Sequence, residues 1–270
     1  FDAKNAIKGS SVQPYKGLIL GQKISTGTAA ELTRQTVTSA AQAAVLFGWG
    51  SVMHAMAIAW FAINKMTELV MFAIDDAAAS AAAVGSIKFG GPAATSSGTV
   101  FLYIGGRLIR VGVTAGDASA AIATACQAAC AADTSLMVTA AVDGEDTTKV
   151  NFTAKNKGTV GNSIDIRVNY QAGQELPGGV TATIVAMASG ATDPDISEII
   201  AVLGEEQFNV VMIPWLDATN LTALETELAD RWGPVRQNDG VAISAKAETV
   251  ANLGTFGNSR NSPHLSVVGF

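Results

Sequence analysis

The sequence predicts an α/β fold, in which helices flank a parallel sheet that is interrupted by an inserted α+β module of mostly antiparallel strands. Near-continuous apolar runs at 15–22, 67–75 and 208–214 alternate with helical segments, a pattern typical of parallel sheets covered on both faces. Between the second and third runs, the sequence shows hairpin turns and strands with alternating polarity. We therefore expect one α/β architecture with a second one inserted into it.

We divide the chain into a discontinuous α/β core domain, residues 1–77 and 193–270, and an inserted domain, residues 78–192, which we expect to face the surface. In the core, helices are expected to open at Asp193–Pro194, where Asp193 is the predicted cap, and at Asp217 or Thr219. The remaining core elements are predicted strands at 240–246 and 264–270 and a short helix at 248–256.

The inserted domain should contain two hairpins and one helix. Gly105–Gly106 and Asp143–Gly144 are the dipeptides expected at the two hairpin turns. The helix between the hairpins should be capped by Asp117 or Ser119. The predicted segments are hairpins at 98–113 and 136–156, a helix at 117–132, and strands at 162–170 and 179–188.

Residues 36–64 carry no charged side chain and could suggest a membrane span, but glycine and serine interrupt the run at 48–51. A span needs about 20 apolar residues in one helix, so two short buried helices are expected and no membrane insertion. In the second helix, large side chains share one arc, which should cover the sheet, with small residues opposite. We expect that alanine face, Ala55, Ala59 and Ala62, to pack against another element of the same subunit, so that Ala59→Leu would overpack the fold.

Composition argues against several functions. The 17 basic and 23 acidic residues give a net charge of -6 without a basic stripe, so no nucleic-acid partner is expected. Cys126 and Cys130 are read as small core residues, and no metal is expected because zinc usually takes four ligands. The glycines of "LILGQKISTGT" lack the lysine of a phosphate loop, so no cofactor is expected.

No catalytic constellation is recognisable. His54 is interpreted as a core or boundary residue, and His264 as a loop residue that hydrogen-bonds at the start of a strand. Neither histidine neighbours a nucleophile-elbow motif, so the chain is not expected to be an enzyme. The alternative is a doubly wound enzyme or ligand-binding protein with its site at the carboxyl ends of the strands, near Gly21, Asp75 and Pro214.

Charged residues near the ends of elements are candidates for contacts between subunits. Three arginines read as exposed cations that could form ion pairs with a neighbour. The possible subunit-interface residues are Arg231, Arg236, Arg260 and His264.

Three long segments carry the most recognisable sequence of the chain. They are "TVTSAAQAAVLFGWGSVMHAMA", "AKNKGTVGNSIDIRVNY" and the stretch from "LGEEQFNVVMIPW" to "NSRNSPHLSVV", and the more specific motifs within them are "ADRWGP", "GNSIDIR" and "RNSPH". In these segments the chain resembles the contractile tail sheath protein of Mu-like phages and prophages. The resemblance extends from about Lys16 to Phe270. The family's middle domain is described as subtilisin-like in fold, with no catalysis implied.

The resemblance implies a structural subunit that polymerises helically around the tail tube and contracts to drive the tube through the host envelope. The implied partners are other sheath subunits in a helical homo-oligomer, the tail tube protein, the baseplate and the tail terminator. The implied location is the virion tail, after assembly in the cytoplasm of the host bacterium. Family members also carry an N-terminal arm and a C-terminal domain, which we expect to be absent from this chain.

Overall fold

The computed structural model describes residues 14–270 and contains one six-stranded sheet in the core. The strand order is β13-β12-β11-β1-β3-β2, and every pair is parallel except β2 with β3. The predicted parallel sheet is therefore confirmed, with an antiparallel edge strand that sequence reasoning missed. Its strands are β1 (Lys16–Gln22), β2 (Gln35–Val37), β3 (Glu68–Ile74), β11 (Val210–Met212), β12 (Val241–Lys246) and β13 (Leu265–Gly269).

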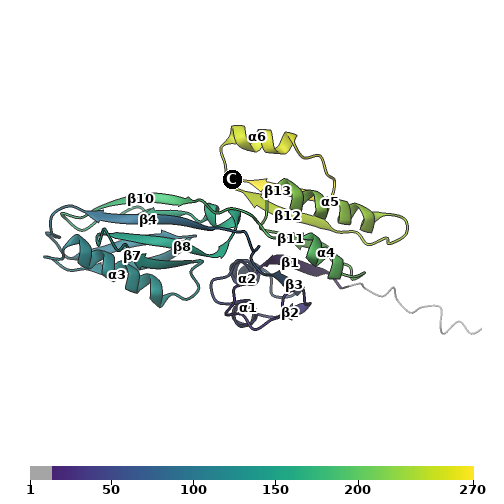
Figure 1. Cartoon of the computed structure of the whole chain (residues 1–270), viewed down its shortest axis with the longest axis horizontal. Helices are drawn as coiled ribbons and strands as arrows, with labels where there is room; N and C mark the ends of the chain where they lie inside the picture. Colours follow the sequence, from purple (N-terminus) through teal and green to yellow (C-terminus); the bar gives the residue numbers. More distant parts are fainter. Residues whose placement is uncertain (1–13) are drawn as a thin grey trace, which may run out of the picture.

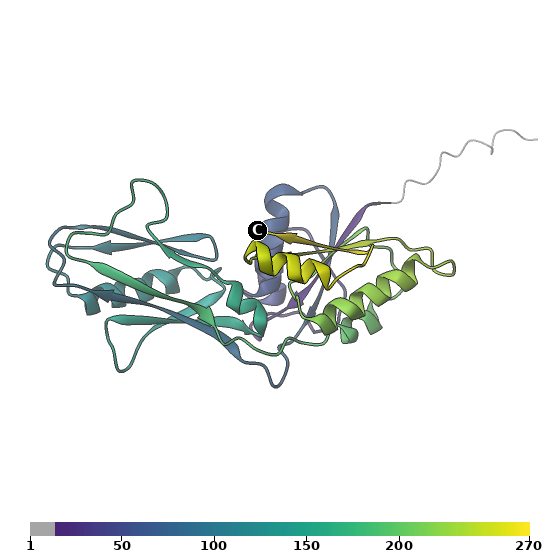
Figure 2. The ribbon, with the colours of Figure 1, turned by 90° about the horizontal axis from the view of Figure 1, so that it is seen from above.

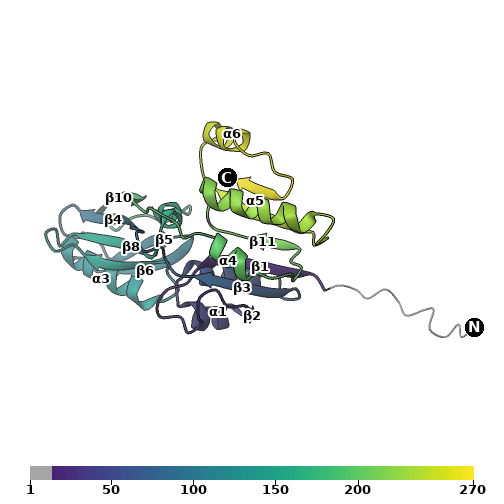
Figure 3. The same ribbon diagram turned by 45° about the vertical axis from the view of Figure 1, so that its right-hand side comes forward.

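Helices cover the two faces of this sheet unequally (Figure 1 and Figure 3). On one face, α1 (Ala40–Phe47) and α2 (Val52–Ile63) pack on side chains of β1 and β3 such as Ile19 and Met71. On the other face, α4 (Ser197–Val202) and α5 (Ala218–Trp232) enclose a second cluster that includes Leu18 and Val211. The short helix α6 (Val250–Asn258) lies beyond α5 and has no buried residue.

The uncharged run forms two helices, as predicted. Gly48, at φ 93°, ends α1, and the Ser51 hydroxyl caps α2 by accepting a hydrogen bond from the backbone N–H of His54 at 3.1 Å. Glycine suits this position because φ is positive. Within residues 14–270, none of the helices combines the length and the hydropathy needed to cross a bilayer.

The predicted orientation of α2 is only partly right. Met53 is buried, and Trp60 lies so close to Gly17 that a Cβ there would come within 2.6 Å of the indole. Ile63, however, is 92% exposed, because it lies at the last position of the helix. Ala59 and Ala62 are also exposed and Ala55 is half-buried, so no described element covers the alanine face at Ala59 and Ala62. The expectation that Ala59→Leu would overpack residues of this chain is therefore wrong for the described structure.

The inserted segment forms two antiparallel sheets around one apolar core. The four-stranded sheet has the order β10-β4-β8-β7, and the three-stranded sheet has the order β6-β5-β9. The elements are β4 (Ala82–Gly90), β5 (Gly98–Ile104), β6 (Arg107–Val113), α3 (Ser119–Ala132), β7 (Val138–Val142), β8 (Lys149–Lys157), the 3-10 helix η2 (Thr159–Ser163), β9 (Ile166–Val168) and β10 (Thr181–Ala188).

Both predicted hairpins are present, and the glycines of the first turn, Gly105 and Gly106, have φ of 54° and 78°. Strand β4 was not predicted. The predicted cap of α3 is wrong: the N-cap is Ala118, and the Asp117 carboxylate instead accepts a hydrogen bond from the N–H of Thr114.

The predicted cap at Asp193 is also wrong. Helix α4 begins at Ser197, and the Asp193 carboxylate accepts hydrogen bonds from the N–H and hydroxyl of Thr159, which follows β8. A side chain expected to start a core helix therefore ties the core to the inserted segment.

The inserted segment extends away from the core along the long axis of the molecule (Figure 1 and Figure 2). We refer to residues 78–192 as the inserted module and to the remaining described residues as the core unit. These domain limits stay a prediction. The separate sheets and the separate apolar cluster of the inserted module support them.

Candidate assembly surface and the carboxyl edge of the sheet

Arg231 lies inside the subunit, so its expected exposure is wrong. Only 3% of the residue is exposed, and its guanidinium donates hydrogen bonds to the Glu227 carboxylate and to the backbone carbonyls of Gly204 and Glu206. Those carbonyls belong to the loop that precedes β11. Arg231 therefore holds this loop against the last turn of α5, and we leave it out of any surface between subunits.

Arg236 and Arg260 also pair within the chain. Arg236 contacts Asp230 and Glu205, both at 2.9 Å, and Glu227 at 3.1 Å, and the hydrogen bonds to Asp230, Glu227 and Glu205 raise its pKa. Arg260 contacts Glu225 at 3.3 Å. Since both charges already have partners, their roles between subunits stay predictions.

His264 lies beside an exposed aromatic side chain. Its backbone carbonyl accepts a hydrogen bond from the N–H of Ala242 at 2.7 Å, so the hydrogen-bonding role expected at the start of the strand is confirmed. Its ring centroid is 6.2 Å from that of Trp232, which is 62% exposed. An exposed tryptophan next to an imidazole has the composition of a contact surface. The interface role of His264 stays a prediction.

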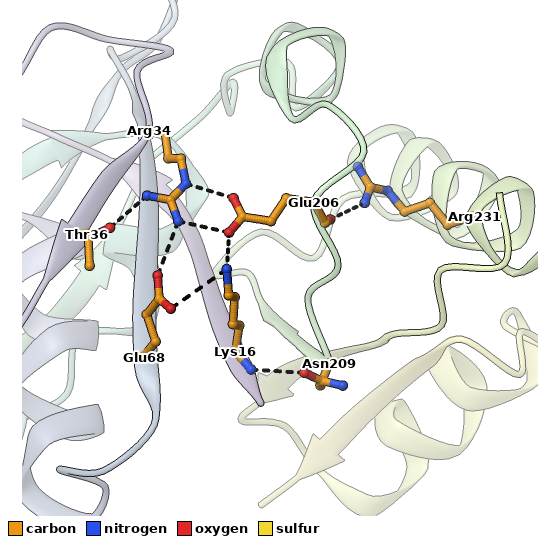
Figure 4. Close-up of polar contacts among 7 residues, drawn as sticks. All are labelled: Lys16, Arg34, Thr36, Glu68, Glu206, Asn209 and Arg231. Carbon is orange, nitrogen blue, oxygen red and sulfur yellow. Dashed lines mark hydrogen bonds and ion pairs between the residues drawn. The ribbon is translucent and has the colours of Figure 1, made fainter. Parts of the chain in front are cut away.

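An ion cluster that sequence reasoning missed joins the amino ends of three strands (Figure 4). Arg34 forms a two-pronged pair with Glu206 at 2.7 and 2.9 Å and also reaches Glu68 at 3.2 Å. Lys16 contacts both carboxylates. A signal was present, because Lys16 and Glu68 begin predicted parallel strands, and the amino ends of such strands meet at one edge of a sheet.

The ion cluster shifts the titration of its members. Hydrogen bonding from Arg34 lowers the pKa of Glu206 to about 2, and Lys16 acts in the same direction. The same pair raises the pKa of Arg34. Arg231 also donates a hydrogen bond to the backbone carbonyl of Glu206. Glu206 is therefore held through both its side chain and its backbone.

The opposite, carboxyl edge is where the alternative function would need a ligand site. In doubly wound sheets, ligands bind where the chain turns to opposite sides of the sheet, which here is between β1 and β11. The fully buried side chains of Gln22 and Trp215 occupy this position, and the indole N–H donates to the Gln22 amide oxygen at 3.2 Å. The protein's own side chains thus fill the usual ligand position.

The three residues named for that alternative do not converge on a site. A Cβ at Gly21 would come within 2.8 Å of the Met53 sulfur, so α2 covers this position. Asp75 forms an ion pair with Lys23 at 2.9 Å, and Pro214 is half-buried next to Trp215.

A polar network at the same edge ties the inserted module to the core unit. The Gln22 amide donates to the Asp76 carboxylate at 2.7 Å and to the Lys157 carbonyl at 2.8 Å. Asn156 donates to Asp76 and to the carbonyl of Lys23 and accepts from the N–H of Val52, at 3.0, 2.9 and 2.9 Å. Buried polar groups that all have partners hold two parts in one arrangement.

An open cleft of about 1000 Å³ lies between the core unit and the inserted module. Its lysine, Lys155, donates to the carbonyls of Trp49 and Thr134 at 3.0 and 2.8 Å, and burial lowers its pKa. Its acid, Asp133, pairs with Arg107. The charged groups of the cleft therefore bind the protein itself.

His54 and the two cysteines are core residues, as interpreted from the sequence. The Nδ1 of His54 accepts a hydrogen bond from the N–H of Gly50 at 3.0 Å, and burial lowers the pKa of the ring. Cys126 and Cys130 are buried and free. Within residues 14–270, no three potential metal-ligating side chains of the His, Cys, Asp or Glu type come together.

These features define a two-part α/β protein whose usual ligand position is closed by its own side chains. The chain is 38% identical over 261 residues to the Mu-like prophage FluMu tail sheath protein of Haemophilus influenzae, a match that covers 97% of this chain and 53% of that protein. The resemblance is thereby confirmed, and the chain is homologous to Mu-like tail sheath proteins along nearly its whole length. It spans about half the length of that relative. No model of a known protein family matches the sequence.

Two solved structures of sheath tail proteins are similar at a lower level. One, from Listeria innocua, is 12% identical with a TM-score of 0.34, covering 87% of this chain and 48% of that chain. The other, from Desulfitobacterium hafniense, is 12% identical with a TM-score of 0.38, covering 97% and 54%.

Proposed function

We propose that the chain is the core part of a contractile tail sheath subunit and not an enzyme. The subunit polymerises helically around the tail tube and contracts to drive the tube through the host envelope. Its partners are other sheath subunits, the tail tube protein, the baseplate and the tail terminator. It is assembled in the host cytoplasm and works in the virion tail. The observation that carries this proposal is the 38% identity to a tail sheath protein over nearly the whole chain.

The internal contacts support a mechanical role. A repeated head-to-tail contact between identical subunits produces an open helical polymer. Contraction of such a polymer requires subunits that rotate as rigid bodies between two packings. The Asp76 network and the bond from Thr159 to Asp193 hold the inserted module and the core unit together, as a rigid subunit requires.

Gene disruption in the source phage or prophage tests this function. Induced particles should then carry bare tail tubes without a sheath, and the intact gene supplied in trans should restore the sheath. Particles with normal contractile sheaths after disruption would contradict the proposal.

A ligand screen addresses the alternative enzyme or binding function, which no feature of the carboxyl edge favours. A ligand present at 100 times its dissociation constant adds about 2.7 kcal/mol of stability. We expect nucleotides and small metabolites to leave the unfolding temperature unchanged. A reproducible shift that a substitution of Gln22 abolishes would favour the alternative.

A further inference from the structure

One face of the core sheet presents apolar side chains that no described residue covers. On β12, Ala242 is 0% exposed beneath α5, whereas Ile243 points to the opposite face and is 38% exposed. On β13, Val268 points to that same face and is 54% exposed. Ser266 is the one polar residue of β12 and β13 on this face. A face in contact with water normally carries polar side chains at most of these alternate positions, so this face has mainly the composition of a buried one.

With α2, this face forms a groove of about 470 Å³. One wall is the side of α2 that carries Met56, Ala59, Trp60 and Ile63, and Ile63 lies at its end. Ala59 is the small side chain of this wall, so a second backbone can approach α2 closely at that position. The other wall is the sheet, and most of the lining is apolar, including Met56, Trp60, Met212, Ile243, Ala245 and Val268.

The path of the chain explains why this face is open. Connections from β11 to β12 and from β12 to β13 step in one direction along the sheet, so right-handed crossovers put α5 and α6 on the same face. The step from β1 to β3 runs the other way and places α1 and α2 on the groove side, over β1 and β3 (Figure 1). Another strand beyond β13 would again place its helix on the α5 face, so a segment that turns back across the sheet is needed to cover the groove.

The length of the matched relative indicates which segment this is. The 261 matched residues are 53% of that protein, so a full-length sheath subunit of similar size contains about as much chain again. We propose that a helix from the part of the same polypeptide outside residues 1–270 packs in this groove, with its apolar side chains against Ile243 and Val268 and its backbone close to Ala59. If only a second copy of the chain could fill the groove, every free subunit would expose an apolar patch. Exposed apolar patches promote aggregation.

Thiol labelling of the full-length protein tests this proposal. Ala59→Cys places a thiol in the groove, and Ala121→Cys places one on an exposed position of α3 as the matched control. The native cysteines are buried. The sample is full-length protein that light scattering shows to be monomeric. In it, the Ala59→Cys thiol should react with a maleimide at least about tenfold more slowly than the control thiol. The reason is that a covered thiol reacts only after local opening of the structure. Val268→Cys, on the opposite wall, should show the same protection.

Two results would overturn the proposal. Labelling of the Ala59→Cys thiol at the rate of the control in the monomer would show that the same polypeptide does not cover the groove. Protection that appears only after assembly would assign the groove to a neighbouring subunit. Because labelling is measured on monomers, failure of the sheath proposal itself would leave these results interpretable.

Discussion

Asn156 of β8 donates a hydrogen bond to the Asp76 carboxylate at 3.0 Å, across the junction between the inserted module and the core unit. The two residues are 80 positions apart, and the same carboxylate also accepts from the Gln22 side chain and the Lys157 backbone. A single acidic side chain thus receives bonds from both parts of the molecule. This relationship explains how a long insertion can move with the core as one body.

Asn156→Ala should weaken this junction strongly. It removes three hydrogen bonds and takes away the partner of the Val52 N–H and of the Lys23 carbonyl, which should lower the free energy of unfolding by about 3 kcal/mol. Urea unfolding measures the change. As a control, Asn258→Ala at the exposed end of α6 should stay within about 0.5 kcal/mol of the parent. Equal effects of the two substitutions would contradict the role of the junction.

The Glu206 carboxylate should make the free energy of unfolding depend on pH in the acid range. Its pKa falls from an ordinary 4.5 to about 2 in the folded protein, so its contribution is fully present above pH 4.5 and is lost as the pH falls toward 2. Glu206→Gln should destabilise the protein by about 1–2 kcal/mol at neutral pH and make this acid loss smaller. Chemical unfolding at a series of pH values measures both effects.

Glu31→Gln is the control for the Glu206 variant. It removes one carboxylate from an exposed position outside the ion cluster. The control should keep the acid-dependent loss of the parent protein. An unchanged pH profile in the Glu206→Gln variant would rule out the cluster as its source.

His54 should contribute a second pH dependence. Burial holds its folded pKa below the ordinary 6.5, so its contribution is present above pH 6.5 and is lost as the pH falls toward the folded pKa. His54→Asn, whose amide oxygen can accept the bond from Gly50 but does not titrate, should flatten this part of the stability profile. His264→Asn should leave it in place, and a profile that is flattened by His264→Asn alone would contradict the assignment.

Replacing Ala57 or Ala59 of α2 by leucine should change the free energy of unfolding of the 270-residue chain by different amounts. Ala57 is fully buried, so Ala57→Leu should cost about 1–3 kcal/mol through overpacking. Ala59 is exposed, so Ala59→Leu should change the free energy of unfolding by less than about 0.5 kcal/mol. Thermal or urea unfolding compares the two, and equal losses would contradict the described orientation of α2.

The elements that sequence reasoning located correctly are those with strong local signals. Ser51 and Asp217 start helices because their side chains can bond the N–H groups three residues later, and each does so. Gly105–Gly106 forms a tight turn because both residues accept positive φ. Long apolar strands such as β1 and β3 were also recognised, since burial on both faces leaves a continuous apolar run.

The features that were missed depend on contacts between distant residues. Asp193 has the composition of a helix cap, yet its carboxylate accepts from Thr159, 34 positions away. Asp117 is an exception, because its carboxylate accepts from the N–H of Thr114 within a local turn. Arg231 reads as a surface charge, and only its position against the loop at Gly204 makes burial favourable. The partners of Glu206 are 172 and 190 residues away, so no local pattern places Glu206 in the ion cluster, although the predicted strand starts at Lys16 and Glu68 indicate that those two side chains lie close together.

The central claim is that this chain is part of a subunit that assembles with copies of itself into a sheath. Electron microscopy of the purified full-length protein tests this claim most directly. Negatively stained samples should contain hollow tubes or stacked rings with a regular repeat, as a head-to-tail contact between identical subunits produces. The account would be contradicted by a protein that stays monomeric, without tubes or rings, across a broad range of protein concentration, salt and pH.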